Sequence, residues 1–259
     1  MKRGAWLIGL LAAGALLLVL LAQGTEPAGE ERTRGRGHAE RAHAVRQGPP
    51  AARARSTATA LCPHPFVPTE PGLWWRFIRS SDAGELAVEL HVDTVEPAGA
   101  AVRVDWTARL DGRAVSFSRR CTPGVDAEDP WFGYAPVGPG TAAVSPTTWR
   151  FPWELEDGAV FAGSTTMTVS VPLAGVGEVA ATTHRRFRVT GREQVETEAG
   201  AFDAVRVDFE GSSTSGSLLA QGSGSLWLAA GVGLVRSEER QGDHVVEQRL
   251  LAFGRGDRP

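Results

Sequence analysis

The stretch Ala204-Val205-Arg206-Val207-Asp208-Phe209 decides the fold of this chain, because its side chains alternate between apolar and polar. Val205, Val207 and Phe209 share one face, whereas the arginine and the aspartate between them fall on the other. This period of two is typical of a half-buried β-strand. The wider segment 190–239 has the same character, with strand-like runs separated by tight glycine turns.

Alternation of the same kind recurs along the chain after residue 61, which predicts an all-β fold. Segments this close together, each with one polar face, favour an antiparallel sheet. The strands are expected at 73–78, 86–93, 102–109, 115–118, 165–171, 181–190, 204–209, 225–229, 234–236 and 244–253. Because wide flat sheets are uncommon, about ten strands in one domain should curl. We therefore predict a curved antiparallel sheet or half-barrel, forming a single β domain over 61–259.

Residues 122–164 break this alternation and contain six prolines with aromatic residues spread among them. Proline at that density prevents a regular ladder of strand hydrogen bonds. The aromatic side chains still need to be buried, so the segment is expected to lie over the sheet. We interpret it as a structural cover loop, with a ligand lid as the alternative.

Residues 1–24 have the pattern of an export segment. Two basic residues precede an apolar run over 5–22, which is close to the ~20 residues that cross a bilayer. We expect either a cleaved signal peptide or a retained membrane anchor. Residues 25–60 carry seven arginines and four glutamates but no aromatic residue, which is typical of a disordered linker. The protein is therefore expected to be periplasmic or secreted, or else anchored to the inner membrane by residues 5–22.

The charge balance argues against a nucleic-acid partner. The chain carries −3 overall, of which residues 1–24 contribute +2 and residues 25–60 contribute +3, so residues 61–259 carry −8. An acidic folded part is unfavourable for binding nucleic acid or anionic lipid. Contact with a membrane is expected only through the N-terminal segment.

The chain has two cysteines, Cys62 and Cys121. An even, small number of cysteines in an exported chain favours a disulfide between them. The alternative is a metal site built on Cys62 and the nearby His64. Two thiols and one imidazole without a second cluster form a weak ligand set, so neither a metal nor a cofactor is predicted.

No catalytic motif is recognisable in the sequence. Neither a Gly-x-Ser-x-Gly elbow nor a His-Glu-x-x-His pair occurs. The Ser/Gly runs at 211–213 and 222–225 are interpreted as flexible links or weakly specified strand edges. His184 falls on the polar phase of a predicted strand and is expected to be exposed. We therefore predict that the protein is not an enzyme, with a hydrolase lacking a recognisable motif as an open alternative.

The sequence has a distinctive pattern over 193–195, 199–207 and 226–235. This pattern resembles the closing half of the TapB-like bacterial exported proteins of unknown function. Phe66-Val67-Pro68 followed by Gly72 and Trp74-Trp75 is similar to the usual opening of those proteins. The resemblance spans residues 61–253 and implies a curved antiparallel sheet, loosely similar to the half-barrel of the lipoprotein carriers LolA and LolB. It implies no catalytic residues, and the cysteine pair and proline-rich middle are not part of the pattern.

The tryptophans are the strongest candidates for ligand-binding residues in this sequence. A concave apolar sheet lined by tryptophan would hold an acyl chain, and exposed tryptophans would stack on sugar rings. The alternative is that they fill the core of a thin curved sheet. The candidate ligand-binding residues are Trp75, Trp106, Trp131, Trp149, Trp153 and Trp227.

These patterns together predict a non-catalytic extracytoplasmic protein of the cell envelope. Its curved sheet is expected to bind an apolar, lipid-like small molecule or to serve only as a structural module. A second hypothesis is a carbohydrate- or protein-binding surface module that uses the proline-rich segment as its contact face.

Overall fold

The computed structural model describes residues 61–82, 84–110, 112–132, 134–136, 142–144, 149–170, 178–215 and 218–256. The predictions for residues 1–24 and 25–60 lie outside these ranges. Within them, no helix is long and apolar enough to cross a membrane.

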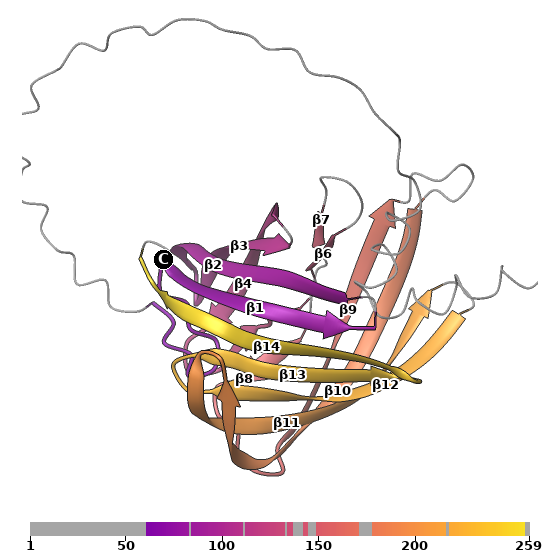
Figure 1. Cartoon of the computed structure of the whole chain (residues 1–259). Coiled ribbons are helices and arrows are strands. Elements are labelled where there is room, and N and C mark those ends of the chain that lie inside the picture. Colours follow the sequence, from indigo (N-terminus) through magenta and orange to yellow (C-terminus); the bar gives the residue numbers. More distant parts are fainter. Residues whose placement is uncertain are drawn as a thin grey trace, which may run out of the picture.

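The described chain forms β-strands almost throughout (Figure 1). Their bounds are β1 (Leu73–Ser81), β2 (Gly84–Ala98), β3 (Ala101–Leu110), β4 (Arg113–Thr122), β5 (Asp126–Glu128), β6 (Tyr134–Pro136), β7 (Ala142–Val144), β8 (Arg150–Pro152), β9 (Val160–Ser170), β10 (Glu178–Thr197), β11 (Gly200–Ser215), β12 (Leu218–Ala229), β13 (Gly233–Gln241) and β14 (His244–Arg255). The predicted all-β class is confirmed.

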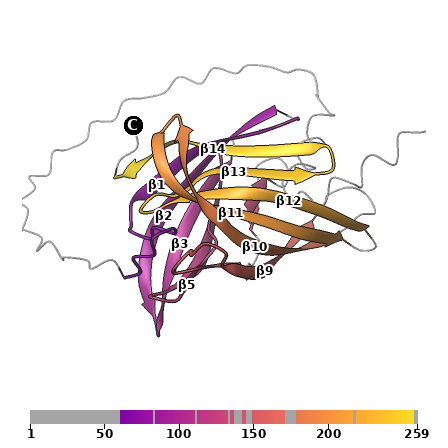
Figure 2. The same ribbon diagram turned by 90° about the horizontal axis from the view of Figure 1, so that it is seen from below.

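Twelve of the strands form one antiparallel sheet in the order β8-β5-β4-β3-β2-β1-β14-β13-β12-β11-β10-β9. Two meanders, β1 to β5 and β9 to β14, are joined where β1 pairs with β14. Seen from below (Figure 2), the sheet curls until the β5 side approaches β9, with β13 and β14 opposite. The predicted curved sheet is thus a nearly closed barrel.

The ten predicted strands correspond to the long strands β1 to β4 and β9 to β14. The proline-rich segment adds four strands of three residues each, of which β5 and β8 extend the main sheet and β6 pairs with β7. Short strands fit the expectation that proline prevents long ladders there. Part of the predicted cover segment lies outside the described residues.

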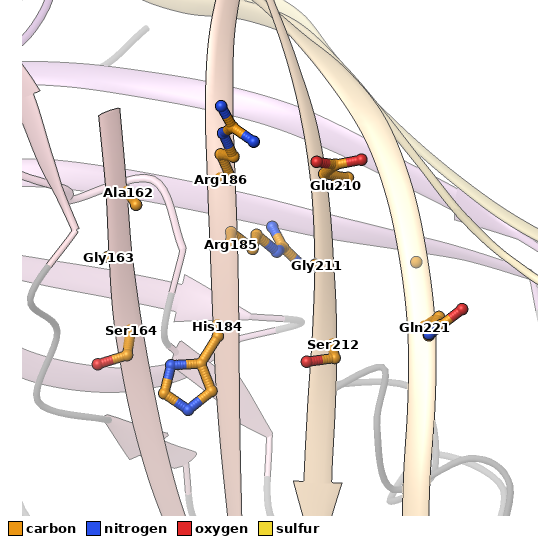
Figure 3. A pocket seen from close by; sticks show the side chains of 11 residues that line it. Ala162, Gly163, Ser164, His184, Arg185, Arg186, Glu210, Gly211, Ser212 and Gln221 are labelled. Carbon is orange, nitrogen blue, oxygen red and sulfur yellow. The ribbon is translucent and has the colours of Figure 1, made fainter. Parts of the chain in front are cut away.

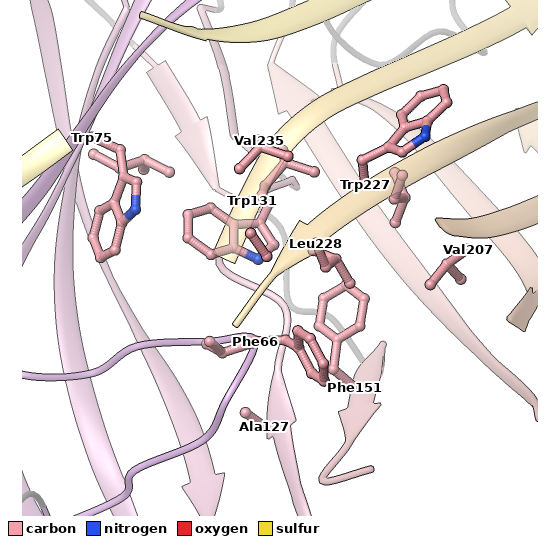
Figure 4. Packing of buried hydrophobic residues seen from close by; sticks show 14 of the residues in the cluster. Phe66, Trp75, Ala127, Trp131, Phe151, Val207, Trp227, Leu228 and Val235 are labelled. Carbon is pink, nitrogen blue, oxygen red and sulfur yellow. The ribbon is translucent and has the colours of Figure 1, made fainter. Parts of the chain in front are cut away.

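The core lies inside the curled sheet and takes large side chains from the proline-rich segment as well as from the strands. Trp131, which follows β5, is fully buried and lies between Trp75 and the strands that carry Leu228 and Val235 (Figure 4). The described part of this segment therefore covers the sheet by filling its interior, as the structural-cover interpretation predicts.

Cys62 and Cys121 form the predicted disulfide, with a Cα–Cα distance of 6.2 Å. The alternative metal site is wrong, because each sulfur is bonded to the other. His64 Nε2 lies 3.1 Å from the carbonyl of Phe151, and its Nδ1 accepts the backbone amide of Val67 at 3.1 Å. Burial lowers the pKa of His64, which favours the neutral imidazole at this buried position.

Candidate functional site

Three of the candidate tryptophans meet at the centre of the barrel. The ring centroids of Trp75 and Trp131 are 5.3 Å apart, and those of Trp106 and Trp131 are 6.2 Å apart. Trp131 and Trp106 are completely buried, and only 1% of Trp75 is exposed. These edge-to-face contacts are those of a packed aromatic core.

The other three candidate tryptophans are not part of that group. Trp149 is buried beside Phe187 of β10, at a centroid distance of 5.7 Å. Trp153 is half-buried and packs against the imidazole of His64. Trp227 lies on the opposite face of β12 from its inward-facing neighbours, and it points away from Trp131 in Figure 4.

The indole of Trp227 is covered by charged side chains. The guanidinium groups of Arg206 and Arg236 lie 5.5 and 4.9 Å from its ring centroid, and its Nε1 donates to Glu193. These contacts leave 7% of Trp227 exposed, so the ring is not an open stacking platform.

A charged residue, Arg185 of β10, reaches into the interior from the side of the barrel. Its guanidinium lies 4.4 Å from the ring centroid of Phe209 and 4.6 Å from that of Trp149. Arg185 Nη2 forms an ion pair of 2.5 Å with Glu239 of β13. One side chain thus connects β10, β13 and the loop that carries Trp149.

Asp129 is the most deeply buried acidic residue in the described part of the chain, with 1% of it exposed. Its Oδ1 accepts the backbone amide of Trp131 at 2.9 Å, while Oδ2 has no hydrogen-bond partner among the described residues. Burial raises the pKa of Asp129 to about 6, against the opposing effect of the amide and of Arg119. Arg119 Nε also donates to the backbone carbonyl of Asp129 at 2.8 Å.

The described residues also form a shallow groove of about 780 Å³ across β9, β10, β11 and β12 (Figure 3). Figure 3 shows Arg185 lying behind the strands, so the groove opens on the outward face of the sheet. It is lined by Ala162, Gly163, Ser164, His184, Arg185, Arg186, Glu210, Gly211, Ser212, Gln221 and Gly222.

Glycines form the floor of this polar groove. Gly163 of β9 and Gly211 of β11 lie directly opposite Arg185 in the register, and Gly222 of β12 lies opposite Gly211. A Cβ on Gly211 would overlap the backbone of β10, so the two strands approach more closely there than a side chain allows. Because these glycines share the face of Arg185, their missing side chains leave room on the inward face, and the floor of the outward groove is formed by backbone.

Three ionisable side chains of the polar groove have no partner in the described part of the chain. Arg186, Glu210 and His184 are exposed, and each lacks a side-chain hydrogen bond or ion pair to any described residue. Elsewhere on the sheet, comparable charges are paired, as in the contact of Arg76 with Glu89 at 3.2 Å. The groove therefore presents these three side chains as free donors and acceptors on the outward face of the sheet.

Sequence reasoning missed this groove. His184 is exposed, as expected. The Ser/Gly runs at 211–213 and 222–225 are not flexible links, because they lie within the paired strands β11 and β12. Gly163, Gly211 and Gly222 lie outside the strands predicted from the sequence, and only the register shows that they are neighbours.

The fold defines an all-β protein built on one curled antiparallel sheet. A DUF3108-like family model matches residues 142–248. A solved structure of a candidate exported protein with a YmcC-like fold, from Bacteroides fragilis, aligns with a TM-score of 0.54 at 16% identity, covering 74% of this chain and all of that chain. This likeness shows the fold alone.

Two further solved structures align less well. A candidate lipoprotein from Parabacteroides distasonis has a TM-score of 0.45 at 15% identity, over 74% of this chain and 99% of that one. The hypothetical lipoprotein YmcC from Escherichia coli has a TM-score of 0.36 at 13% identity, over 73% and 86%. No curated protein matches the sequence. None of these comparisons shows the expected likeness to TapB-like proteins or to LolA and LolB.

Proposed function

We propose that this chain is a non-catalytic protein of the extracytoplasmic envelope, which binds a polar ligand in the groove across β9 to β12. The observation that carries this proposal is that Arg186, Glu210 and His184 lie exposed around one groove without a partner among the described residues. Binding sites typically place a few convergent polar groups on a rigid element, and this groove has that arrangement.

Three observations support the compartment. The apolar run over 5–22 has the pattern of an export signal or anchor. The disulfide between Cys62 and Cys121 is of the kind that persists outside the cytoplasm. The protein from Bacteroides fragilis that shares the fold is itself described as a candidate for export.

The proposal moves the ligand away from the tryptophans. An acyl chain in the interior would have to displace Trp131, which the core already surrounds on all sides. A sugar stacked on the proline-rich segment would need an open indole, whereas 5% of Trp149 is exposed. The apolar-ligand and sugar-stacking hypotheses therefore stay predictions.

A binding screen of the full chain tests the proposal. The melting temperature is measured in the presence of polar envelope compounds, including amino sugars, peptidoglycan peptides and phospholipid headgroups. We expect at least one saturable shift that disappears in the double variant Arg186→Ala, Glu210→Gln. The matched control is Arg76→Ala, Glu89→Gln, which removes the same charges from an outward-facing pair on β1 and β2.

Two outcomes would overturn this function. Shifts that are equal in the wild type and in the groove variant would place binding elsewhere. Turnover in an esterase and glycosidase screen, lost on substitution of His184 or Ser212, would make the groove a hydrolase site, because these two residues are direct cross-strand neighbours.

A further inference from the structure

Arg186 and Glu210 occupy directly opposite positions on β10 and β11. Opposite charges at such positions normally attract one another, since facing Cβ atoms in an antiparallel pair lie about 5 Å apart. The equivalent pair Arg76 and Glu89, on β1 and β2, does form an ion pair. Arg186 and Glu210 form none, so both charges are available to a third group.

The groove separates donors from acceptors along the strands. On β10, Arg186 and His184 are two residues apart on the same face and supply N–H donors. Beside them, the carboxylate of Glu210 on β11 accepts hydrogen bonds. A ligand matched to this arrangement has an anionic group over β10 and a cationic N–H donor over Glu210.

The same arrangement disfavours other ligand classes. A purely anionic ligand would be repelled by Glu210, and a purely cationic one by Arg186. No aromatic side chain lines the groove in the described residues, so a sugar ring has no surface on which to stack. A small zwitterion satisfies both charges at once.

We propose that the groove binds phosphoethanolamine, with the phosphate at Arg186 and His184 and the ammonium at Glu210. This inference rests on the proposed function, because it names the ligand class of the same groove. The phosphate accepts hydrogen bonds from a guanidinium, and the primary ammonium donates to a carboxylate. The two charged centres are joined by a two-carbon bridge, which suits two side chains on neighbouring strands.

The first experiment measures binding of soluble glycerophosphoethanolamine to the full chain by isothermal titration calorimetry. Its counterpart, glycerophosphocholine, has the same charges but no N–H on its cationic nitrogen. We expect saturable binding of the ethanolamine compound and about tenfold weaker binding of the choline compound, as for a lost charged hydrogen bond. Equal affinities for the two compounds, or no binding of either, would overturn the proposal.

Variants locate the binding. Arg186→Ala is expected to lower the affinity for glycerophosphoethanolamine by about tenfold or more. Glu210→Gln is expected to abolish the preference for ethanolamine over choline. Arg76→Ala and Glu89→Gln should leave both affinities unchanged, and circular dichroism verifies that each variant is folded. An unchanged preference in Glu210→Gln would contradict the assignment of the ammonium.

Vesicle binding distinguishes a lipid headgroup from a free metabolite as the source of the phosphoethanolamine. Binding to phosphatidylethanolamine vesicles as well as to the soluble compound identifies a lipid headgroup, whereas binding to the soluble compound alone identifies a free metabolite. If a different compound binds to the wild type and its binding is lost in Arg186→Ala, the phosphoethanolamine assignment fails while the proposed function stands. If no compound depends on Arg186 or Glu210, both fail.

Discussion

The indole of Trp131 lies directly against Gly233, so the proline-rich segment reaches across the barrel to the turn between β12 and β13. A Cβ on Gly233 would lie 2.7 Å from Cη2 of Trp131 and 3.3 Å from the carbonyl oxygen of Phe66. Gly233 also has a φ of +90°, which L side chains rarely adopt. The close contact and the backbone conformation both require glycine at this position.

Gly233→Ala should destabilise the protein by at least about 2 kcal/mol, because it adds a steric overlap to a strained φ. Gly231→Ala is the matched control, since Gly231 has a φ of +75° but nothing within 4 Å of its would-be Cβ. Gly231→Ala should lower the free energy of unfolding by about 1 kcal/mol, because only the backbone conformation is strained. Urea denaturation measures both, and equal losses would show that Trp131 does not occupy this position.

Removing the disulfide should destabilise the protein by about 4 kcal/mol. Cys62 and Cys121 are 59 residues apart, and the bond restricts the unfolded chain over that loop. The double variant Cys62→Ala, Cys121→Ala is compared with the wild type by urea denaturation, with and without reductant. The reductant should lower the stability of the wild type only. An equal response of both proteins would mean that the bond does not form.

Asp129 should make stability depend on pH in the acidic range. Its pKa in the folded protein is about 6, against an ordinary value of 3.8, so folding favours the protonated form. The resulting stabilisation is present below pH 3.8 and is lost as the pH rises through 6, by an amount of about 3 kcal/mol. The difference in unfolding free energy between wild type and Asp129→Asn should therefore change over this window. A constant difference from pH 4 to pH 7 would contradict the burial of this carboxyl group.

The ion pair between Arg185 and Glu239 should be costly to break from one side. Glu239→Ala leaves the mostly buried guanidinium without its carboxylate and should cost about 2 kcal/mol or more. Replacing both residues by apolar ones, as in Arg185→Met, Glu239→Leu, should restore much of that loss. Chemical denaturation of Arg185→Met, of Glu239→Leu and of the double variant gives the coupling energy, which would be near zero if the pair were solvated.

The sequence was sufficient to predict the long strands, because alternation such as that of Val205, Val207 and Phe209 is a local property. It could not place Trp131, because the proline-rich segment has no periodicity and its packing depends on distant strands. The alternation of Leu226, Trp227 and Leu228 did contain the information that Trp227 faces away from the interior. The polar groove depends on register, which links residues of four strands and cannot be obtained from any single one of them.

The most direct test of the central claim, that the chain's own aromatic side chains fill the barrel, is a ¹⁵N–¹H spectrum of the tryptophan indoles in the full chain. Signals are assigned with single Trp→Phe variants, then followed during titration with a fatty acid and with a soluble paramagnetic agent. We predict that Trp75, Trp106 and Trp131 respond to neither reagent, whereas the half-buried Trp153 is broadened by the paramagnetic agent. Saturable shifts of Trp131 and Trp75 on addition of fatty acid would show an interior that opens to an apolar ligand, and would contradict this account.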